Sequence, residues 1–379
     1  MKQKEYIGFE SIKNLVLVLS ELSAKKIFLV TGKDSYSSSG SKEHLTKLLV
    51  DFEVDRFFDF SSNPKIEDVN KGVEVFKYAQ CDTVIAVGGG SVIDMAKLIN
   101  FFAVNNLNPL EYFKTSKKHV QKPKPLIAIP TTAGSGSEAS SFAVLYVGKK
   151  KFSVDNKFVL PDVAIVDPAL TMSLPEHITA VTGMDVLSQA IESYWSINSN
   201  DESKKFARSA IKLTMANLVT AVNNADTFSR LAMAKAAHFA GKAINITKTT
   251  ASHAISYPLT SYFDIPHGHA AGLTLSSMFE YNAGVSDEDV LEPRGCEYVR
   301  KTLNEIAALL GRKCVIEAKD KIDKLMFKIG LETKLSRLGV NSQEDIETII
   351  ANSFDSDRVA NNPRKVTRES LREILEMIY

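Results

Sequence analysis

The sequence is poor in cysteine and tryptophan, with 3 Cys and 1 Trp among 379 residues. The cysteines, Cys81, Cys296 and Cys314, lie far apart, and none belongs to a C-x-x-C pair. This excludes a disulfide framework and a cysteine zinc site. Separate free thiols are typical of a reducing compartment, so we expect a cytoplasmic protein.

The chain also lacks an excess of charge of one sign and a long apolar run. Its 46 basic and 45 acidic residues give a net charge of +1, which provides no general field for nucleic acid or an anionic membrane. The first apolar run, 15–19, is soon broken by polar residues, so no secretory or membrane-spanning segment is expected. The most basic cluster, 149–151, is short and has the character of a solvated turn.

The first 170 or so residues alternate short apolar runs with helical patterns, which indicates a doubly wound parallel sheet. Helices are expected near 42–50, through Val69, Val73 and Phe76, and from Ile93 to Leu98. A hairpin is expected over 142–154. The expected strands are 25–31, 57–61, 83–87, 126–129 and 163–166.

After Leu174 and Pro175 the strand patterns end and long amphipathic segments follow. We therefore predict an α/β domain over 1–172 and an all-helical domain over 173–379, with the boundary inside 168–175. The expected helices are 179–196, 202–223, 227–245, 298–311, 316–337 and 343–354.

Two loops with glycine and hydroxyl side chains follow neighbouring strands of the expected sheet. The first, 88–91, reads G-G-G-S, and Ser91 is expected to cap the next helix and to donate to a phosphate. The second, 131–137, reads T-T-A-G-S-G-S, and both loops should project from the ligand-binding edge. The G-x-G-x-x-G fingerprint is absent, and a plain glycine-rich turn is the alternative. Together the loops predict a nucleotide with a pyrophosphate, bound by Gly89, Gly90, Ser91, Thr131, Thr132 and Ser135.

The stretch 248–270 holds His253 and His267, the first in a helical segment and the second after Pro266 in an expected loop. Two imidazoles suit a transition metal but are too few ligands by themselves. Asp185 and Gln189 stand four residues apart near an expected helix start, so they share one face and could complete the site. The alternative is that His253 is a core histidine and His267 a turn residue. Asp185 would then be a first-turn carboxylate favoured by the helix dipole.

The order G-G-G-S, P-T-T-x-G-S-G-S-E, A-I-V-D-P, T-G-M-D and H…P-H-G resembles the iron-dependent group III alcohol dehydrogenases. The resemblance covers nearly the whole chain, and the combined motifs are highly specific. It implies the dehydroquinate synthase-like fold, with a Rossmann-like nucleotide-binding domain, a helical domain and a metal in the cleft. It also implies that NAD(P) lies along the two loops and that Asp185, His253 and His267 bind the metal.

The sequence departs from this family at three positions. Gln189 stands where the family has its fourth ligand, a histidine, and Tyr257 replaces another histidine. An amide oxygen binds Fe²⁺ or Zn²⁺ less well than imidazole, so the metal is expected to be Fe²⁺ or Zn²⁺ held weakly, a different ion, or absent. Gly32 replaces an aspartate that favours NAD, and with Lys33 beside it a 2′-phosphate is not repelled, so the expected cofactor is NADPH or NADH. Lys151 is a further cofactor-binding candidate.

The segments around Gln189, His253 and Arg294 are most like the phosphonoacetaldehyde reductase branch, whose members make 2-hydroxyethylphosphonate. A phosphonate needs cationic and N–H donors. The T-K-T-T sequence at 247–250 could supply them at the start of the helix that carries His253, or could merely cap that helix. The candidate substrate-binding residues are Lys248, Thr249, Ser252 and Arg294.

The implied reaction is reduction of a small aldehyde by NAD(P)H, with the metal as Lewis acid. His267, Tyr257 and His269 are the candidate catalytic residues, and the sequence leaves open whether Tyr257, His269 or solvent supplies the proton. The alternatives are a reductase of a neutral or carboxylated aldehyde, a lyase like dehydroquinate synthase, and a nucleotide-binding relative without catalysis. We expect a homo-oligomer, at least a dimer, with a small molecule as its other partner.

Overall fold

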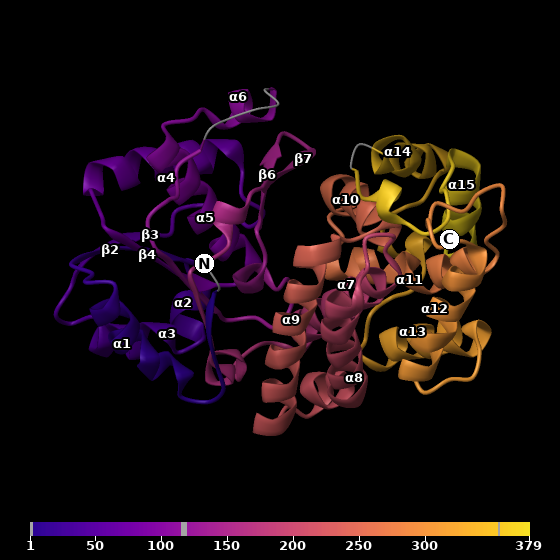
Figure 1. The fold of residues 1–379 in the computed structure, drawn as a ribbon, viewed down its shortest axis with the longest axis horizontal. Helices are drawn as coiled ribbons and strands as arrows, with labels where there is room; N and C mark the ends of the chain where they lie inside the picture. Colours follow the sequence, from indigo (N-terminus) through magenta and orange to yellow (C-terminus); the bar gives the residue numbers. More distant parts are fainter. Residues whose placement is uncertain (1–2, 115–119, 355–356) are drawn as a thin grey trace. The chain divides into compact units, whose positions relative to one another are not determined.

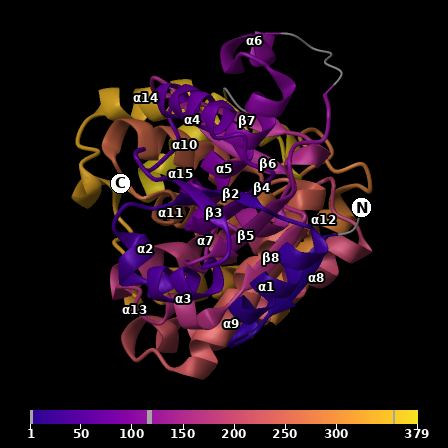
Figure 2. The same cartoon turned by 90° about the vertical axis from the view of Figure 1, so that its left-hand side faces the viewer.

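The computed structural model describes residues 3–114, 120–354 and 357–379. The chain divides into two compact units, Met1–Leu174 and Pro175–Tyr379. Figures 1 and 2 show the secondary structure of both units. The predicted division, after residue 172, differs from this one by two residues.

The first unit is built on a parallel sheet with the strand order β1-β8-β5-β4-β2-β3. The neighbours β4 and β5 pair from Val84 opposite Leu126 to Gly88 opposite Pro130, so their carboxyl ends are level. The strands are β1 (Lys4–Ile7), β2 (Lys26–Thr31), β3 (Glu53–Phe57), β4 (Thr83–Gly88), β5 (Leu126–Pro130) and β8 (Val163–Val166).

Both faces of this sheet are buried, which explains why its central strands are apolar throughout. Phe28 and Val30 belong to one core, shared with α4 and α5, whereas Ile27 and Leu29 belong to another, shared with α1 and α3. Figure 1 shows these helices on opposite sides of the strands. The helices are α1 (Asn14–Glu21), α2 (Ser35–Ser38), α3 (Ser41–Leu48), α4 (Ile66–Ala79), α5 (Gly90–Asn105) and α6 (Pro109–Lys114).

The predicted hairpin is present as β6 (Phe142–Val147) and β7 (Lys150–Asp155), which turn at Gly148 with a φ of 58°. One expected strand was wrongly placed, and one strand was missed. The second strand is Glu53–Phe57 rather than 57–61, and β1 was not predicted at all. Both lie at the edges of the sheet and carry polar, exposed residues, so neither has the apolar run that reveals a central strand.

In the residues that the structure describes, the second unit contains helices, connecting loops and one isolated β-bridge between Val290 and Arg364. Helix α7 has almost no exposed face, because it packs against α8, α9 and α11. Its helices are α7 (Glu176–Trp195), α8 (Asp201–Asn223), α9 (Thr227–Thr247), α10 (Ala251–Phe263), α11 (His267–Ala283), α12 (Cys296–Leu309), α13 (Val315–Lys328), α14 (Gln343–Ser353) and α15 (Arg368–Met377).

The predicted helix 316–337 was wrong as a single element. Helix α13 ends at Lys328, Gly330 follows with a φ of 73°, and a separate 3₁₀ turn covers Leu335–Leu338. Helix α15, which was not predicted, is stabilised by a capping box between Thr367 and Ser370. Among the described residues, no helix has the length and apolar character needed to cross a membrane.

Candidate metal centre and cofactor loops

Three side chains from three helices of the second unit meet in the ligand triad, which consists of Asp185, His253 and His267. One ligand atom from each lies within 4.8 Å of the others. Nε2 of His253 is 3.3 Å from Oδ1 of Asp185, and the two imidazole rings are 5.4 Å apart, centre to centre. Asp185 and His253 are buried. A carboxylate and two imidazoles within this distance can ligate one divalent ion.

The helices place these ligands differently from the prediction. Asp185 lies in the middle of α7 rather than in its first turn, so the dipole explanation for this aspartate fails. His267 is the first residue of α11, with Pro266 as its N-cap, and not a loop residue. Gly268 allows the approach of α11 to α7, because a Cβ there would lie 2.2 Å from the carbonyl oxygen of Val181. The P-H-G sequence is therefore needed to bring His267 beside Asp185.

Glu192 orients His253 from the opposite side. Its carboxylate accepts hydrogen bonds from Nδ1 of His253, from the hydroxyl of Thr250 at 2.9 Å and from the backbone N–H of His253 at 3.2 Å. Fixing Nδ1–H in this way turns Nε2 toward Asp185. Glu192 was not among the predicted site residues. The available signal was its spacing, since residues 185, 189 and 192 share one face of α7.

The charges of this buried group are strongly coupled. Burial alone would lower the pKa of His253, but the carboxylates of Glu192 and Asp185 raise it to about 10. Burial would raise the pKa of Asp185, yet hydrogen bonding to His253 and the nearby His267 keep that pKa below its usual value. The pKa of Glu192 is lowered by His253 in the same way, against the effect of burial. The group thus keeps two carboxylates ionised, as a cation site requires.

Gln189 is buried one turn after Asp185, and its amide hydrogen-bonds to that carboxylate. Its oxygen, Oε1, has no hydrogen-bond partner among the residues that the structure describes. A buried carbonyl oxygen without a donor costs about 1–3 kcal/mol. A cation beside the triad would remove that cost, so the donor set fits a divalent ion.

Tyr257 and Ser256 lie against the third ligand. The Tyr257 ring stacks on His267 with a centre-to-centre distance of 5.9 Å, and the Ser256 hydroxyl is 3.1 Å from Nδ1 of His267. Tyr257 therefore stands where it could exchange a proton with a group bound near the triad.

The structure does not bring His269 or Arg294 to the triad. Nε2 of His269 lies 2.6 Å from the carbonyl oxygen of Glu332, and burial lowers the pKa of His269. Arg294 is held by the carboxylate of Glu292, by Ser199 and by the ring of Tyr298. Both side chains are thus engaged in contacts within the helical unit.

The segment before His253 has an unusual backbone. Lys248, the C-cap of α9, has a φ of 62° and a ψ of 177°, a backbone conformation that residues other than glycine rarely adopt. Hydrogen bonds fix its neighbours, since Asn361 donates to the carbonyl oxygen of Thr249 at 3.0 Å. The hydroxyl of Ser252, in the first turn of α10, is buried without a partner in the described part of the chain.

In the first unit, the two predicted cofactor loops lie side by side at the carboxyl edge of the sheet. The backbone N–H of Thr131 donates to the carbonyl oxygen of Gly88 at 3.0 Å. A Cβ on Gly90 would lie 2.4 Å from Oγ of Ser135, and one on Gly89 would be 3.4 Å from the Thr132 side chain. The glycines therefore leave room for loop-to-loop contact and expose backbone where a phosphate could approach.

Two expectations about the cofactor-binding candidates were wrong in detail. The N-cap of α5 is Gly89, and Ser91 is already inside the helix, where its Oγ accepts from the backbone N–H of Asn63 at 3.2 Å. Lys151 lies within β7, opposite Tyr146, and not in a solvated turn.

Gly32 follows β2 at the same edge of the sheet, and Lys33 beside it is exposed. Arg56, which the sequence analysis did not name, donates to Oγ1 of Thr31 at 2.8 Å and to the carbonyl oxygen of Gly32 at 3.1 Å. Its guanidinium also lies over the Tyr36 ring, 4.5 Å from the centre. The end of β2 therefore carries cationic side chains where the family has an aspartate.

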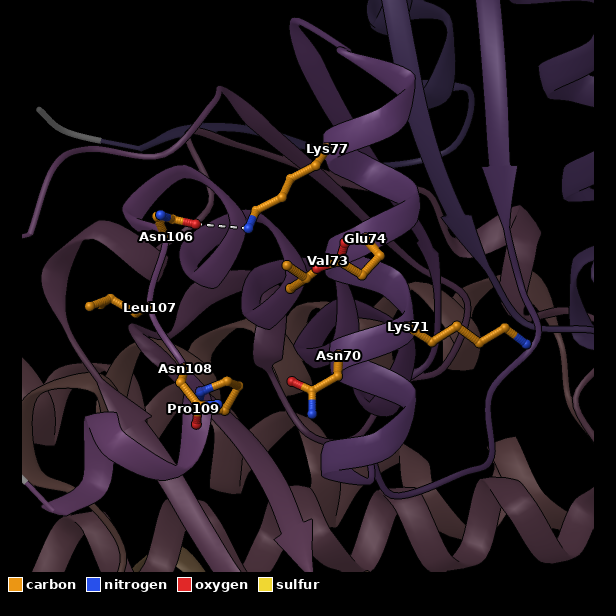
Figure 3. Close-up of a pocket in the computed structure, with 9 residues that line it drawn as sticks. All are labelled: Asn70, Lys71, Val73, Glu74, Lys77, Asn106, Leu107, Asn108 and Pro109. Carbon is orange, nitrogen blue, oxygen red and sulfur yellow. Dashed lines mark hydrogen bonds between the residues drawn. The ribbon is translucent and has the colours of Figure 1, made fainter.

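A separate depression lies between α4 and the segment after α5 (Figure 3). Its lining includes Lys71, Glu74 and Lys77, and Nζ of Lys77 donates to Oδ1 of Asn106 at 2.8 Å. It contains none of the predicted site residues.

Comparison with known proteins shows the family of the chain. Residues 3–168 match the family described as "Iron-containing alcohol dehydrogenase", and residues 179–379 match "Fe-containing alcohol dehydrogenase family, C-terminal". The chain belongs to the iron-containing alcohol dehydrogenase family. It is therefore an oxidoreductase of the alcohol and aldehyde dehydrogenase kind. The predicted α/β and all-helical fold is confirmed.

Relatives within the family have different substrates in their names. The chain is 34% identical to the phosphonoacetaldehyde reductase of Streptomyces viridochromogenes, over 78% of this chain and 76% of the relative. It is 32% identical to the NAD-dependent methanol dehydrogenase of Bacillus methanolicus, over 98% and 96%. The crystal structure of sulfoacetaldehyde reductase from Bifidobacterium kashiwanohense in complex with NAD⁺ superposes with a TM-score of 0.88, at 34% identity over 99% of this chain and 96% of that one.

Proposed function

We propose that this protein is a metal- and NAD(P)H-dependent reductase of a small aldehyde that carries a tetrahedral anionic group. The observation that carries the proposal is the buried triad of Asp185, His253 and His267 beside the unpartnered oxygen of Gln189. The preferred substrate is phosphonoacetaldehyde, which would give 2-hydroxyethylphosphonate. Two proteins that are 34% identical to this chain support the class, since their names specify a phosphonate and a sulfonate on the same two-carbon aldehyde.

Asp185, His253 and His267 would hold the ion, with Gln189 as a fourth oxygen donor. When bound, an Fe²⁺ or Zn²⁺ ion polarises the carbonyl oxygen and the nicotinamide supplies a hydride. Glu192 keeps His253 in the tautomer that presents Nε2. Tyr257, stacked on His267, is the better candidate than His269 for the proton of the product alcohol, because His269 is bonded to the Glu332 carbonyl.

The anionic group would bind beside Lys248, Thr249 and Ser252. Three observations support this position. The strained backbone at Lys248 is fixed by surrounding hydrogen bonds, the Ser252 hydroxyl is buried without a partner in the described residues, and both stand at the start of the helix that carries His253. Strained backbone is concentrated at ligand sites, and a helix start favours an anion. Arg294 has no such support, since Glu292 already neutralises it.

The loops 88–91 and 131–137 would hold the pyrophosphate of the cofactor, and Gly32 would face its adenosine ribose. Lys33 and Arg56 at that strand end favour tolerance of a 2′-phosphate, so NADPH is proposed alongside NADH. Lys151 remains a proposed contact. We also propose a homo-oligomer on the family resemblance alone, which light scattering after size-exclusion chromatography would test.

The test is NAD(P)H oxidation with phosphonoacetaldehyde, sulfoacetaldehyde and unsubstituted acetaldehyde, before and after chelation and after Fe²⁺ or Zn²⁺ is added back. We expect faster turnover of the anionic aldehydes, lost with the chelator and restored by metal. Turnover of acetaldehyde alone would overturn the substrate class. A protein that binds metal but reduces no aldehyde would support the catalytically impaired alternative.

Lys248→Ala tests the anion site independently of the reduction step. We expect the KM for an anionic aldehyde to rise about tenfold or more while the KM for acetaldehyde changes little, because a charge-assisted contact is lost only with the anion. Lys205→Ala, on the exposed face of α8, is the matched control. Equal effects of Lys248→Ala on both substrates would contradict its assignment.

A further inference from the structure

Lys97 is a buried lysine in α5, and its ammonium group reaches into the segment that follows the second cofactor loop. Nζ donates to the carbonyl oxygens of Ser137 at 2.6 Å, Ser140 at 2.8 Å and Phe142 at 2.8 Å. A fourth, longer contact joins Nζ to Oγ of Ser137 at 3.1 Å, so this one segment satisfies all three donors of the ammonium group. These contacts fix the course of the backbone from 137 to 142.

Asp94 holds the same segment from one turn earlier on α5. Its Oδ1 accepts from the Ser137 hydroxyl at 2.5 Å, and its Oδ2 accepts from the backbone N–H of Val144 at 3.0 Å. Ser137 is therefore bound on both sides, by Asp94 through its hydroxyl and by Lys97 through its carbonyl oxygen. The second loop is attached to α5 at its end, through side chains that belong to a single helix.

Helix α5 also begins in the first loop, with Gly89 as its N-cap. The first loop therefore leads directly into α5, and the second loop is held by hydrogen bonds to Asp94 and Lys97 of the same helix. The two loops also touch, because the space beside Gly90 is filled by Ser135, whose Oγ would be 2.4 Å from an added Cβ. A shift of either loop by an ångström would open or close this contact.

Stability alone explains this buried charge poorly. Burial lowers the pKa of Lys97 to about 8, against the opposing charges of Asp94 and Glu138, and burial raises the pKa of Asp94. Burying an ion pair is often no better for stability than an apolar replacement. The pair instead defines one position of the loop, because its hydrogen bonds to the backbone of 137–144 are directional.

We propose that Lys97 and Asp94 are a positioning pair that fixes the second loop against the first, so that both loops can contact the pyrophosphate of the cofactor together. This inference rests on the proposed nucleotide site. Neither side chain needs to touch the cofactor, because both act through the backbone of 137–144. The pair would therefore affect any ligand that spans both loops, whatever aldehyde is reduced.

Lys97→Met tests the pair with a side chain of similar length and no charge. We expect the Kd of NADH and of ADP-ribose, which both carry a pyrophosphate, to rise by about tenfold to a hundredfold, because three hydrogen bonds to the loop are lost. The Kd of adenosine 5′-monophosphate should change much less. Lys77→Met, on α4 of the same unit, removes a hydrogen bond to Asn106 and is the matched control.

Ser137→Ala is the second variant. It removes the hydroxyl that bonds to Asp94 at 2.5 Å and to Lys97 at 3.1 Å, and it leaves both buried charges in place. We expect a rise of about threefold to tenfold in the same two Kd values. Hydrogen exchange measured without any ligand reports directly on the protection of the loop amides. In Lys97→Met the amides of 131–144 should exchange faster than in the wild type, while those of β4 should not.

Folded Lys97→Met protein with unchanged Kd values and unchanged exchange over 131–144 would overturn the proposal. A wild-type protein that binds no dinucleotide would instead overturn the proposed cofactor site, and the exchange measurement would still decide whether Lys97 and Asp94 position the loop.

Discussion

Glu192 accepts a hydrogen bond from Nδ1 of His253, and the other ring nitrogen of His253 lies 3.3 Å from Asp185. A histidine ring held between two carboxylates has its orientation determined before any ion binds. The carboxylate of Glu192 also makes the ring a stronger donor toward a metal.

Glu192→Gln should therefore weaken metal binding at nearly unchanged side-chain volume. The amide has a single acceptor oxygen, whereas Nδ1 of His253 donates to one oxygen of the carboxylate and the Thr250 hydroxyl donates to the other. We expect the metal Kd to rise about tenfold to a hundredfold. Competition with a chromophoric chelator would measure it. Glu344→Gln, exposed in the first turn of α14, is the control and should leave the Kd unchanged. An unaltered Kd in Glu192→Gln would show that the carboxylate does not support the ligand.

Gln189→His tests whether the amide limits metal affinity. An imidazole is a better ligand than an amide oxygen for Fe²⁺ and Zn²⁺, so the metal Kd should fall on the order of tenfold or more. Gln189→Leu keeps the volume but removes the oxygen, and its metal Kd should rise. The same chelator competition reads both variants. If Gln189→Leu binds metal as tightly as the wild type, the oxygen of Gln189 is not a ligand.

Gly90→Ala should displace the second loop, because the new Cβ would lie 2.4 Å from Oγ and 2.8 Å from Cβ of Ser135. Overpacking of this kind costs about 1–3 kcal/mol of folding free energy. We expect a lower Tm and weaker NADH binding, by calorimetry and fluorescence titration. Adding Ser135→Gly removes both clashing atoms and should restore the Tm. A double variant no better than Gly90→Ala would locate the strain elsewhere.

The cysteines should differ in reactivity. Cys314 is exposed, whereas burial raises the pKa of the Cys81 thiol to about 12. A raised thiol pKa means less thiolate at any pH below it, so Cys81 should react slowly with iodoacetamide at pH 8 and Cys314 quickly. Mass spectrometry of the peptides would follow both. Equal alkylation rates would mean that Cys81 becomes exposed more readily than its burial in the core of the first unit indicates.

The sequence predicts the central strands and the long helices well, because each carries a local signal. Strands β2, β4, β5 and β8 are buried on both faces and read as apolar runs. The edge strands β1 and β3 each pair with only one neighbouring strand and carry polar residues. Their sequences therefore lack the apolar run that predicts a strand, and only the folded structure reveals their pairing.

At the candidate site, the residues of the triad were named from motifs, whereas their supports were not. Glu192 and Lys97 are charged residues inside helices, and local spacing alone gives each the appearance of a surface residue. Their partners, His253 and the backbone of Ser137, come from other elements 61 and 40 positions away. His267 was expected in a loop because Pro266 precedes it, although proline also suits the position just before a helix.

The pairing of β1 with β8 places Tyr6 opposite Ile165. A ribosome adding about 5–20 residues per second therefore leaves β1 without its partner for on the order of ten seconds or more. Until β8 emerges, the growing sheet ends at β5, whose unpaired edge is apolar and open to other chains. We infer that the first unit cannot complete its sheet until β8 has been synthesised, and that it depends on β8 to close its own edge.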